Sequence, residues 1–119
     1  MTEYILGIDT SAYTTSVALS ELCSGEISAD KRRVLSVPAG QKGLRQQDAV
    51  FQHLKNFREL YEEIEADLKN IKVVSVSSKP RNVKGSYMPV FTVGQNYGKI
   101  IARTNSCVSV MEGNEPVVI

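Results

Sequence analysis

The residues best suited to phosphate chemistry follow directly after a short apolar run near the N-terminus. Asp9, Thr10 and Ser11 come at the end of the run that begins at Tyr4, a pattern typical of a buried strand. Hydroxyls and backbone N–H groups at a tight turn can bind phosphate, and a carboxylate can hold a hydrated Mg²⁺ ion. The same residues can instead satisfy only the backbone of the turn. Two interpretations stay open, a phosphate-binding turn and a purely structural one.

A second candidate group lies in a polar loop ahead of a predicted helix. It consists of Lys79, Arg81, Gly85 and Ser86. Helix N-termini bind anions, and nearby cations strengthen that binding. The alternative interpretation is an ordinary solvated loop in which the serine caps the helix. This group and the first are the phosphate- or nucleotide-binding candidates of the chain.

His53 is the single histidine, and the apolar periodicity places it on the flank of a long helix. Such a histidine is typical of a partly buried packing residue, and its alternative role is a polar group that faces a site. Cys23 and Cys107 are far apart and have no CxxC spacing, so we expect reduced thiols. Because these three side chains are scattered, no metal site is predicted. The pattern defines no catalytic base or nucleophile, and the catalytic residues stay unknown.

Charge is unevenly distributed, although the net charge is only +1. Residues 59–67 contain acids and no base, whereas residues 69–111 contain lysines and arginines and no acid. A basic segment can attract phosphate or nucleic acid, and it can also simply solvate loops and helix faces. Aromatic residues do not alternate with arginines here, so the signal for single-stranded nucleic acid is weak.

The elements that would position these residues follow the order β-β-β-α-β-α-β. Strands are predicted at residues 4–9, 14–19, 32–37, 71–77 and 106–111, with a short last strand at 116–119. A three-strand meander followed by two crossover helices gives a mixed sheet with helices flanking it. The fold class is therefore α/β with a ribonuclease-H-like architecture.

Two helices are predicted, over residues 44–68 and 87–104. The first has an apolar stripe formed by Val50, Leu54, Phe57, Tyr61, Ile64 and Leu68. Pro89 is tolerated only in a first helical turn, so the second helix should begin near Ser86. Gly94 and Gly98 each weaken that helix by about 1 kcal/mol relative to alanine, unless close packing against the sheet compensates.

The length of 119 residues and the globular composition, with 42% hydrophobic residues, predict a single domain with one core. Disorder is excluded because it needs low hydrophobicity and high net charge. No apolar run approaches the roughly 18 residues of a membrane span. The N-terminus lacks the basic region of a signal peptide, so we expect a cytoplasmic protein without membrane partners.

Several motifs in this order are shared with one family. They are the Gly7–Ser11 turn with the small-residue strand 15–19, the segment Phe51–Leu54, the Pro80 loop and the helix start at Gly85. Over roughly residues 4–104 the chain resembles the tRNA threonylcarbamoyladenosine transferases, also described as O-sialoglycoprotein endopeptidases or glycoproteases. They belong to the actin-like ATPase superfamily. The resemblance implies one lobe of that fold, with the two candidate groups on its nucleotide side and His53 as a possible site-facing residue.

The resemblance does not extend to the family's metal motif or to its second lobe. The family's His-x-x-x-His metal motif has no counterpart, because residues 111–115 read Met-Glu-Gly-Asn-Glu, and the tail 105–119 departs from the family pattern. A nucleotide and a divalent metal are therefore implied only for full-length relatives, and no bound cofactor is predicted for this chain. A truncated or frameshifted reading frame and a genuine short relative both explain the missing second lobe.

Three functional hypotheses follow. The first is a one-lobe relative, residues 1–119, that is inactive by itself, with tRNA as a partner implied only by the resemblance. The second is a degenerate binding or scaffold module that pairs with itself or with a full-length relative, with residues 116–119 as a candidate exposed edge. The third is a Mg²⁺-dependent nuclease, which needs several carboxylates. Its candidates are Asp9, Glu3, Glu21 and Asp48.

Overall fold

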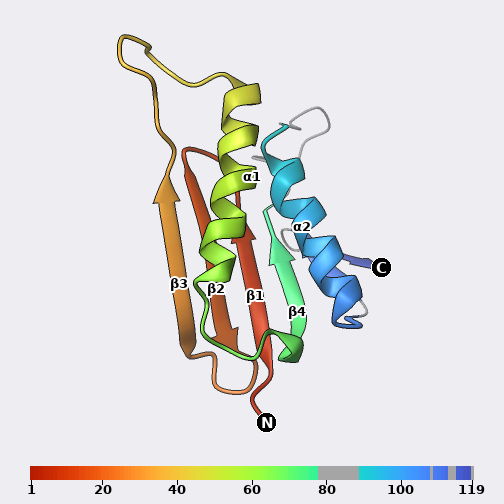
Figure 1. Ribbon diagram of the computed structural model, residues 1–119. Coiled ribbons are helices and arrows are strands. Elements are labelled where there is room, and N and C mark those ends of the chain that lie inside the picture. The colour runs from red at the N-terminus through yellow and green to blue at the C-terminus, as the bar shows by residue number, and fades with distance from the viewer. Residues whose placement is uncertain (78–88, 108, 113–114, 119) are drawn as a thin grey trace.

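The computed structural model describes residues 1–77, 89–107, 109–112 and 115–118 (Figure 1). The strands are β1 (Tyr4–Asp9), β2 (Thr14–Glu21), β3 (Ile27–Val34), β4 (Ile71–Val76), β5 (Ser109–Glu112) and β6 (Glu115–Val118). The helices are α1 (Gln46–Glu62), α2 (Phe91–Thr104) and the short 3₁₀ helix η1 (Leu68–Asn70). Among the described residues, no helix is both long and apolar enough to cross a membrane.

The strands form one sheet in the order β3-β2-β1-β4-β5-β6. β1, β2 and β3 form an antiparallel meander, β4 is parallel to β1, and β5 is parallel to β4. β6 adds to the edge as an antiparallel partner of β5. The helices α1 and α2 make the crossovers that parallel pairing requires. The predicted α/β, ribonuclease-H-like mixed sheet is therefore confirmed.

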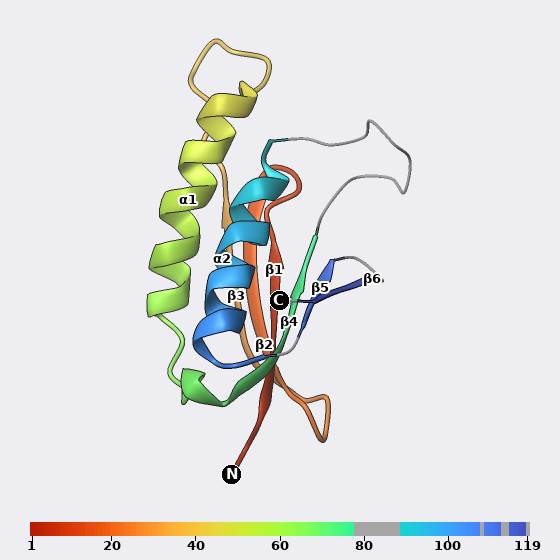
Figure 2. The ribbon, with the colours of Figure 1, turned by 90° about the vertical axis from the view of Figure 1, so that its right-hand side faces the viewer.

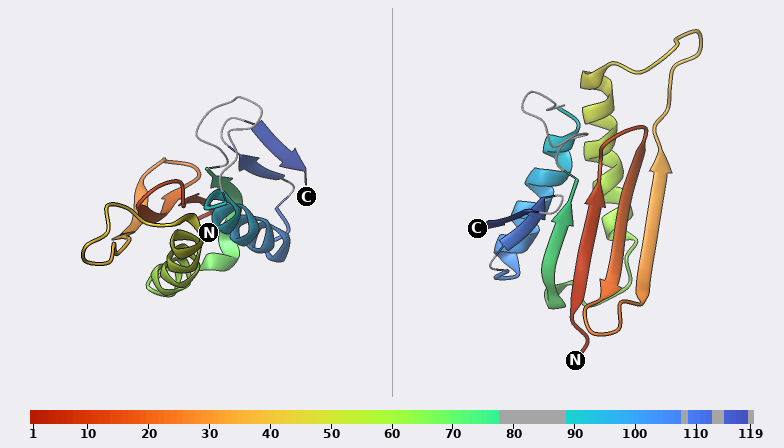
Figure 3. Two further views of the ribbon diagram at one scale, coloured as in Figure 1. Left: turned by 90° about the horizontal axis from the view of Figure 1, so that it is seen from above. Right: turned by 180° about the vertical axis from the view of Figure 1, so that it is seen from behind.

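Both α-helices lie on the same face of the sheet (Figure 2). The view from behind shows β1 to β4 without a helix across them (Figure 3). Side chains on this second face are small where β1, β2 and β4 run side by side, with Gly7, Ala18 and Ser75 in adjacent register. Within the described part of the chain, the predicted helices thus flank the sheet on one side only.

The core lies between the sheet and the two helices. Alternate residues of the strands point into it, as the pleat of a strand requires: Leu6, Ile8, Val17, Leu19, Val74 and Val76. Phe57 and Leu60 of α1 cover these side chains. The Phe57 ring stacks on Tyr97 of α2 with centroids 4.3 Å apart, so the two helices share one core.

The helix α1 is shorter than predicted and is rotated relative to the predicted stripe. It ends at Glu62, where the N–H of Glu63 donates to the Leu60 carbonyl over 3.1 Å and the N–H of Ile64 donates to the Tyr61 carbonyl over 3.2 Å. Its buried residues are Ala49, His53, Asn56, Phe57 and Leu60. Leu54, which was predicted to be in the apolar stripe, is 39% exposed. The prediction was wrong because it counted only apolar side chains, and two polar residues occupy the buried face.

The helix α2 begins later than predicted. Its first residue is Phe91, because Pro89 and Val90 form the turn before it. Ser86, near which the helix was expected to begin, lies outside the described residues. The expected close packing is confirmed. A Cβ on Gly98 would lie 2.7 Å from Val76 Cγ1, and one on Gly94 would lie 3.2 Å from Ile8 Cγ2.

The third strand was predicted at 32–37, and β3 instead spans Ile27–Val34. The chain reverses at Gly25, whose φ of 76° is the left-handed conformation that glycine adopts without strain. Pairing with β2 therefore starts earlier and covers a charged stretch, residues 30–33. Charged side chains are tolerated there because β3 is an edge strand. The last two strands shift by a few residues, to 109–112 and 115–118.

Candidate functional site

The first candidate group lies where the carboxyl ends of β1 and β4 meet. Because the two strands are parallel, Asp9 at the end of β1 comes beside Ser77, which follows β4. The Ser77 hydroxyl donates to Asp9 Oδ1 over 2.9 Å, and the Ser77 N–H donates to the Ile8 carbonyl over 3.1 Å. This edge of a parallel pair is where α/β sheets place their ligand sites.

Asp9 is exposed, and its carboxylate organises the turn that follows it. The Ser11 N–H donates to Asp9 Oδ1 over 2.9 Å, and the same oxygen accepts the Ser77 hydroxyl. Ser11 itself is half-buried. The arrangement is an Asx turn, so the structural interpretation of this motif explains the contacts of Oδ1 without a ligand.

Thr10 is completely buried and connects β1 to α2. Its hydroxyl donates to the Val90 carbonyl over 2.8 Å and accepts from the Gly94 N–H over 3.2 Å. Both bonds are made to backbone groups at the first turn of α2, where the Val90 carbonyl also accepts from the Val93 N–H over 3.4 Å. In this arrangement, Thr10 fixes the helix beside the candidate edge and does not face solvent.

The second candidate group lies outside the described residues. Lys79, Arg81, Gly85 and Ser86 all fall within residues 78–88. The described residues on either side of this segment are Ser77, which follows β4 beside Asp9, and Pro89, which precedes α2. The binding role of these four residues stays a prediction.

His53 is completely buried between α1 and the start of β2. Its Nδ1 lies 2.8 Å from Thr15 Oγ1, and its Nε2 lies 3.0 Å from the Ala12 carbonyl oxygen. The Asn56 amide donates to Thr15 Oγ1 over 3.3 Å. Burial lowers the pKa of His53, against smaller opposing effects of the Ala12 carbonyl and the Asp9 charge.

Sequence reasoning missed three polar residues at this edge and beneath it: Ser77, Thr15 and Asn56. Ser77 could have been found, because it is the polar residue at the carboxyl end of the strand predicted at residues 71–77. Thr15 and Asn56 carry no such signal, since their pairing depends on how α1 is rotated against β2.

The carboxylates of the nuclease hypothesis are not brought together. Glu3 and Glu21 lie at the opposite end of β1 from Asp9, because Tyr4 pairs with Glu21 and Asp9 pairs with Ser16. Among the described residues, no group of three His, Cys, Asp or Glu side chains could hold a metal ion. The geometry of the described residues thus gives no support to two-metal cleavage.

Both cysteines are free thiols. Cys107 is buried beside the start of β4, where its Sγ donates to the Ile71 carbonyl oxygen over 3.4 Å. Burial raises the pKa of this thiol above its usual value, so it is held protonated. Cys107 therefore belongs to the core rather than to a reactive site.

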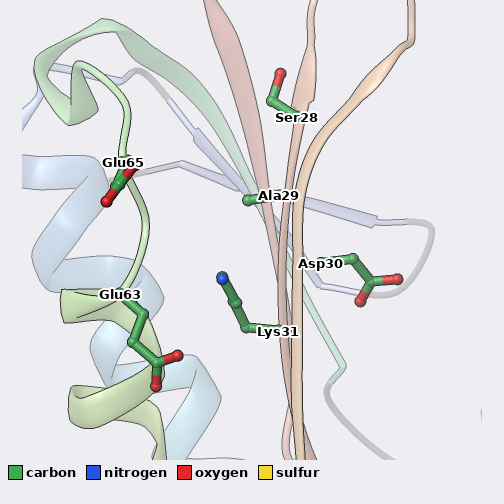
Figure 4. Close-up of a pocket in the computed structure, with 6 residues that line it drawn as sticks. All are labelled: Ser28, Ala29, Asp30, Lys31, Glu63 and Glu65. Atoms are coloured by element: carbon green, nitrogen blue, oxygen red, sulfur yellow. The ribbon is translucent and has the colours of Figure 1, made fainter.

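A separate hollow of about 520 Å³ lies between β3 and the chain after α1 (Figure 4). Lys31 points toward the side where Glu63 and Glu65 lie, whereas Asp30 points to the other side of the strand. Asp30 is held there by Arg32 through two hydrogen bonds of 3.0 Å. The hollow is lined by β3, which is separated from β1 and Asp9 by β2, and it is not part of the candidate edge.

The strand order and the two crossover helices define the class of fold, a ribonuclease-H-like lobe of the kind found in actin-like ATPases. Two solved structures from Pseudomonas aeruginosa have this fold. The first is YeaZ, with a TM-score of 0.55 and 17% sequence identity, covering 92% of this chain and 43% of that chain. The second is an uncharacterized protein with similarity to peptidase YeaZ, with a TM-score of 0.54 and 16% identity, covering 92% and 42%.

YeaZ is a protein of the glycoprotease family, so the resemblance predicted from the short motifs is confirmed at the level of the fold. The chain spans less than half the length of either solved relative. No family model matches the sequence, and no curated protein matches it.

Proposed function

We propose that this chain is a one-lobe relative of the glycoprotease-like family that contributes to tRNA threonylcarbamoyladenosine modification and is inactive by itself. The observation that carries the proposal is the state of two residues, Asp9 at the candidate edge and His53 in the core between α1 and β2. Each is a residue type that could do acid–base chemistry, and each is already bonded to its own chain.

For Asp9, one carboxylate oxygen accepts both the Ser11 N–H and the Ser77 hydroxyl. For His53, both ring nitrogens are engaged and the side chain is inaccessible to solvent. A general base must reach the proton it removes, directly or through one water. A fully buried imidazole lacks that access, which favours a structural role for this lobe over a catalytic one.

The turn at Asp9 fits a nucleotide phosphate poorly by itself. The Ser11 N–H points at Asp9 Oδ1 and is therefore not available to an anion. A carboxylate also repels phosphate unless a divalent cation lies between them. The described residues thus support the expectation that nucleotide and metal belong to full-length relatives. The loop with Lys79 and Arg81 remains the better anion candidate in the proposal.

The test is a modification assay with purified chain, unmodified tRNA and a threonylcarbamoyl donor, read by mass spectrometry of the tRNA nucleosides. The chain alone should give no modified adenosine above the protein-free blank. Added to a full-length relative, it should change the yield. Product from the chain alone that disappears in Asp9→Asn, but not in the control Asp30→Asn, would overturn the proposal.

A second candidate function is a binding module, and a surface on the helices favours it. Phe51 and Ile100 are each 63% exposed, and Leu54 is 39% exposed. A groove of about 330 Å³ runs between α1 and α2 and includes Leu54, Tyr97 and Ile100. We call Phe51, Leu54 and Ile100 the helix patch. Contiguous exposed apolar surface of this kind marks interaction sites in many proteins.

In this second proposal the helix patch pairs with another copy of the chain or with a full-length relative. Light scattering after size-exclusion chromatography tests it. The double variant Phe51→Ser/Ile100→Ser should lose any association, whereas the control Val34→Ser should keep it. Val34 is a fair control because it is an apolar residue of β3 that is 70% exposed. A chain that stays monomeric at high concentration and ignores the relative would contradict this function.

A further inference from the structure

The strand β3 forms an open edge of the sheet in the described structure. It is eight residues long and pairs with β2 on one side only. No described segment lies along its other side (Figures 1 and 3). Ile27 and Val34, at the two ends of β3, are 66% and 70% exposed. An edge of this kind can accept a further strand, and its charged side chains decide which strand fits.

The backbone of β3 directs bonding groups outward at alternate residues. The Leu35 N–H donates to the Tyr13 carbonyl over 2.7 Å, so these two residues form a hydrogen-bonded pair that continues the ladder of β2 and β3. Bonded and non-bonded pairs alternate along an antiparallel ladder. The N–H and C=O groups of Asp30, Arg32 and Val34 therefore point away from β2. A strand added at this edge would bond to these residues.

The side chains of β3 carry charge on both faces. Asp30 and Arg32 bond to each other along the strand and are still 44% and 66% exposed. Lys31 points to the opposite face, toward the side where Glu63 and Glu65 line the hollow beside β3 (Figure 4). One face of β3 thus has an acid and a base two residues apart, and the other borders a hollow with more carboxylates than cations.

A second copy of β3, antiparallel to the first, is complementary to it in one register. Opposite residues of an antiparallel pair share a face, so the two-fold axis between identical strands passes through a residue. With the axis at Lys31, Asp30 of each copy lies opposite Arg32 of the other. With the axis at the residue before or after, Asp30 faces its own copy, or Arg32 does. Opposite charges stabilise such pairs and like charges destabilise them, so the charges select the axis at Lys31.

The helix side of the pair fits the same register. Ala29, which lines the hollow, then lies opposite Arg33 of the second copy. This arrangement brings a second cation to a hollow that contains Glu63 and Glu65. The unfavourable contact is between the two Lys31 residues at the axis, and each of them points toward the side where carboxylates of its own chain lie.

We propose that β3 is a self-pairing edge, through which two copies of this chain join their sheets about a two-fold axis at Lys31. The partner is a second copy because the symmetry makes the pair of Asp30 with Arg32 form twice. Each copy contributes mainly one strand, so the contact is small and the association weak and concentration-dependent. The pairing goes beyond the functions proposed above, and its surface differs from the helix patch.

Charge reversal tests the register. Asp30→Arg places like charges opposite each other at both symmetric positions, and so does Arg32→Asp. Sedimentation equilibrium should show a dimer of the wild type and a dissociation constant raised about tenfold or more in each variant. An equimolar mixture of the two variants should form a heterodimer, because every cross-strand pair then has opposite charges. A mixture that associates no better than either variant alone would overturn the proposal.

Lys42→Asp is the matched control, because it makes the same change of charge as Arg32→Asp at an exposed residue of a loop. It should associate like the wild type. Asp30 and Arg32 are exposed as well, so their variants should keep the fold, and circular dichroism checks this. A wild type that stays monomeric at the highest concentration that remains in solution would refute the pairing, and so would equal weakening by Lys42→Asp.

Hydrogen exchange of the wild type gives a readout that needs no variant. The Arg32 N–H points away from β2, whereas the alternation directs the Lys31 N–H toward β2. A higher protein concentration should therefore slow exchange at Asp30 and Arg32 more than at Lys31. Exchange at Arg32 that does not depend on concentration, in a sample that sediments as a dimer, would place the contact elsewhere and overturn the proposal.

The same measurements separate β3 from the helix patch as the contact between two copies. A dimer that persists in Phe51→Ser/Ile100→Ser and is lost in Asp30→Arg supports pairing through β3. A dimer that is lost in the first variant and persists in the second belongs to the helix patch and contradicts the present proposal. The tRNA modification assay reads a different property, so failure of the pairing and failure of the proposed function are distinguishable.

Discussion

Gly98 of α2 lies directly against Val76 of β4, so closely that a Cβ on the glycine would be 2.7 Å from the Val76 Cγ1. A second valine, Val74, would be 3.2 Å away. The absence of a side chain at this position lets the helix approach the sheet next to β1 and β4. That approach brings Gly94 within hydrogen-bond reach of Thr10 at the candidate edge.

Gly98→Ala should therefore destabilise the protein, although alanine is the better helix former. The clash with the valines costs about 1–3 kcal/mol, against about 1 kcal/mol gained in helix propensity. We expect a net loss of about 1 kcal/mol in the free energy of unfolding, measured by urea denaturation. Asn96→Ala on the exposed side of α2 is the control and should change stability by less than about 0.5 kcal/mol. A more stable Gly98→Ala would show that the helix lies farther from the sheet.

The rotation of α1 can be tested with two leucines of the same helix. Leu60 is 3% exposed, whereas Leu54 is 39% exposed. Leu60→Ala should cost about 2–5 kcal/mol, as buried leucines do, and Leu54→Ala should cost less than about 1 kcal/mol. Thermal and urea unfolding of the pair measure the difference. Equal losses of unfolding free energy in the two variants would favour the apolar stripe expected from periodicity. They would contradict the buried face of α1 seen in the structure.

The Thr10 hydroxyl should contribute to stability through α2. Thr10→Val keeps the shape but removes the hydroxyl that donates to the Val90 carbonyl and accepts from the Gly94 N–H, so we expect a loss of about 1–3 kcal/mol. Thr10→Ser keeps the hydroxyl and removes one methyl, which should cost about 1 kcal/mol. Hydrogen exchange at the Gly94 amide distinguishes loss of the hydroxyl from loss of the methyl group. Only Thr10→Val should make this amide exchange faster, because only that variant lacks the acceptor. Unchanged exchange in Thr10→Val would argue against the bond.

The free energy of unfolding should depend on pH through His53. Burial lowers the pKa of this residue in the folded protein, so below about 6.5 the unfolded chain binds more protons than the folded one. The contribution of neutral His53 to the free energy of unfolding is then complete above about pH 6.5 and is lost as the pH falls toward the lowered pKa of the folded protein. Urea unfolding from pH 7.5 to pH 5.5 should show a smaller decline in His53→Gln than in the wild type. An equal decline of the free energy of unfolding in the two proteins would mean that carboxylates, and not His53, cause the pH dependence.

Much of the fold could be predicted from local patterns. The β1 bounds at residues 4–9 match the apolar run that ends in Asp9, and β4 matches the β-branched run that starts at Ile71. These runs are informative because alternate side chains of an inner strand are buried. The β3 bounds could not be predicted in this way, since an edge strand is free to carry charge at Asp30 and Arg33.

The candidate site was predictable only in part. The sequence shows that a polar turn, Asp9 to Ser11, follows a strand. It does not show that these residues have different roles. Only contacts across the fold show that Thr10 faces α2 while Asp9 reaches Ser77. The function of Lys79 and Arg81 stays a prediction, because these residues lie outside the described part of the chain.

By itself the sequence determined the order of the strands and helices, and with it the ribonuclease-H-like class, because apolar periodicity records which side of each element is buried. Only the tertiary structure decided that His53 and Asn56 lie inside the core and that Gly98 lies against Val76. The reason is physical. A polar side chain can be buried when partners far away in the sequence satisfy its hydrogen bonds, and those partners come together only when α1 packs across β2.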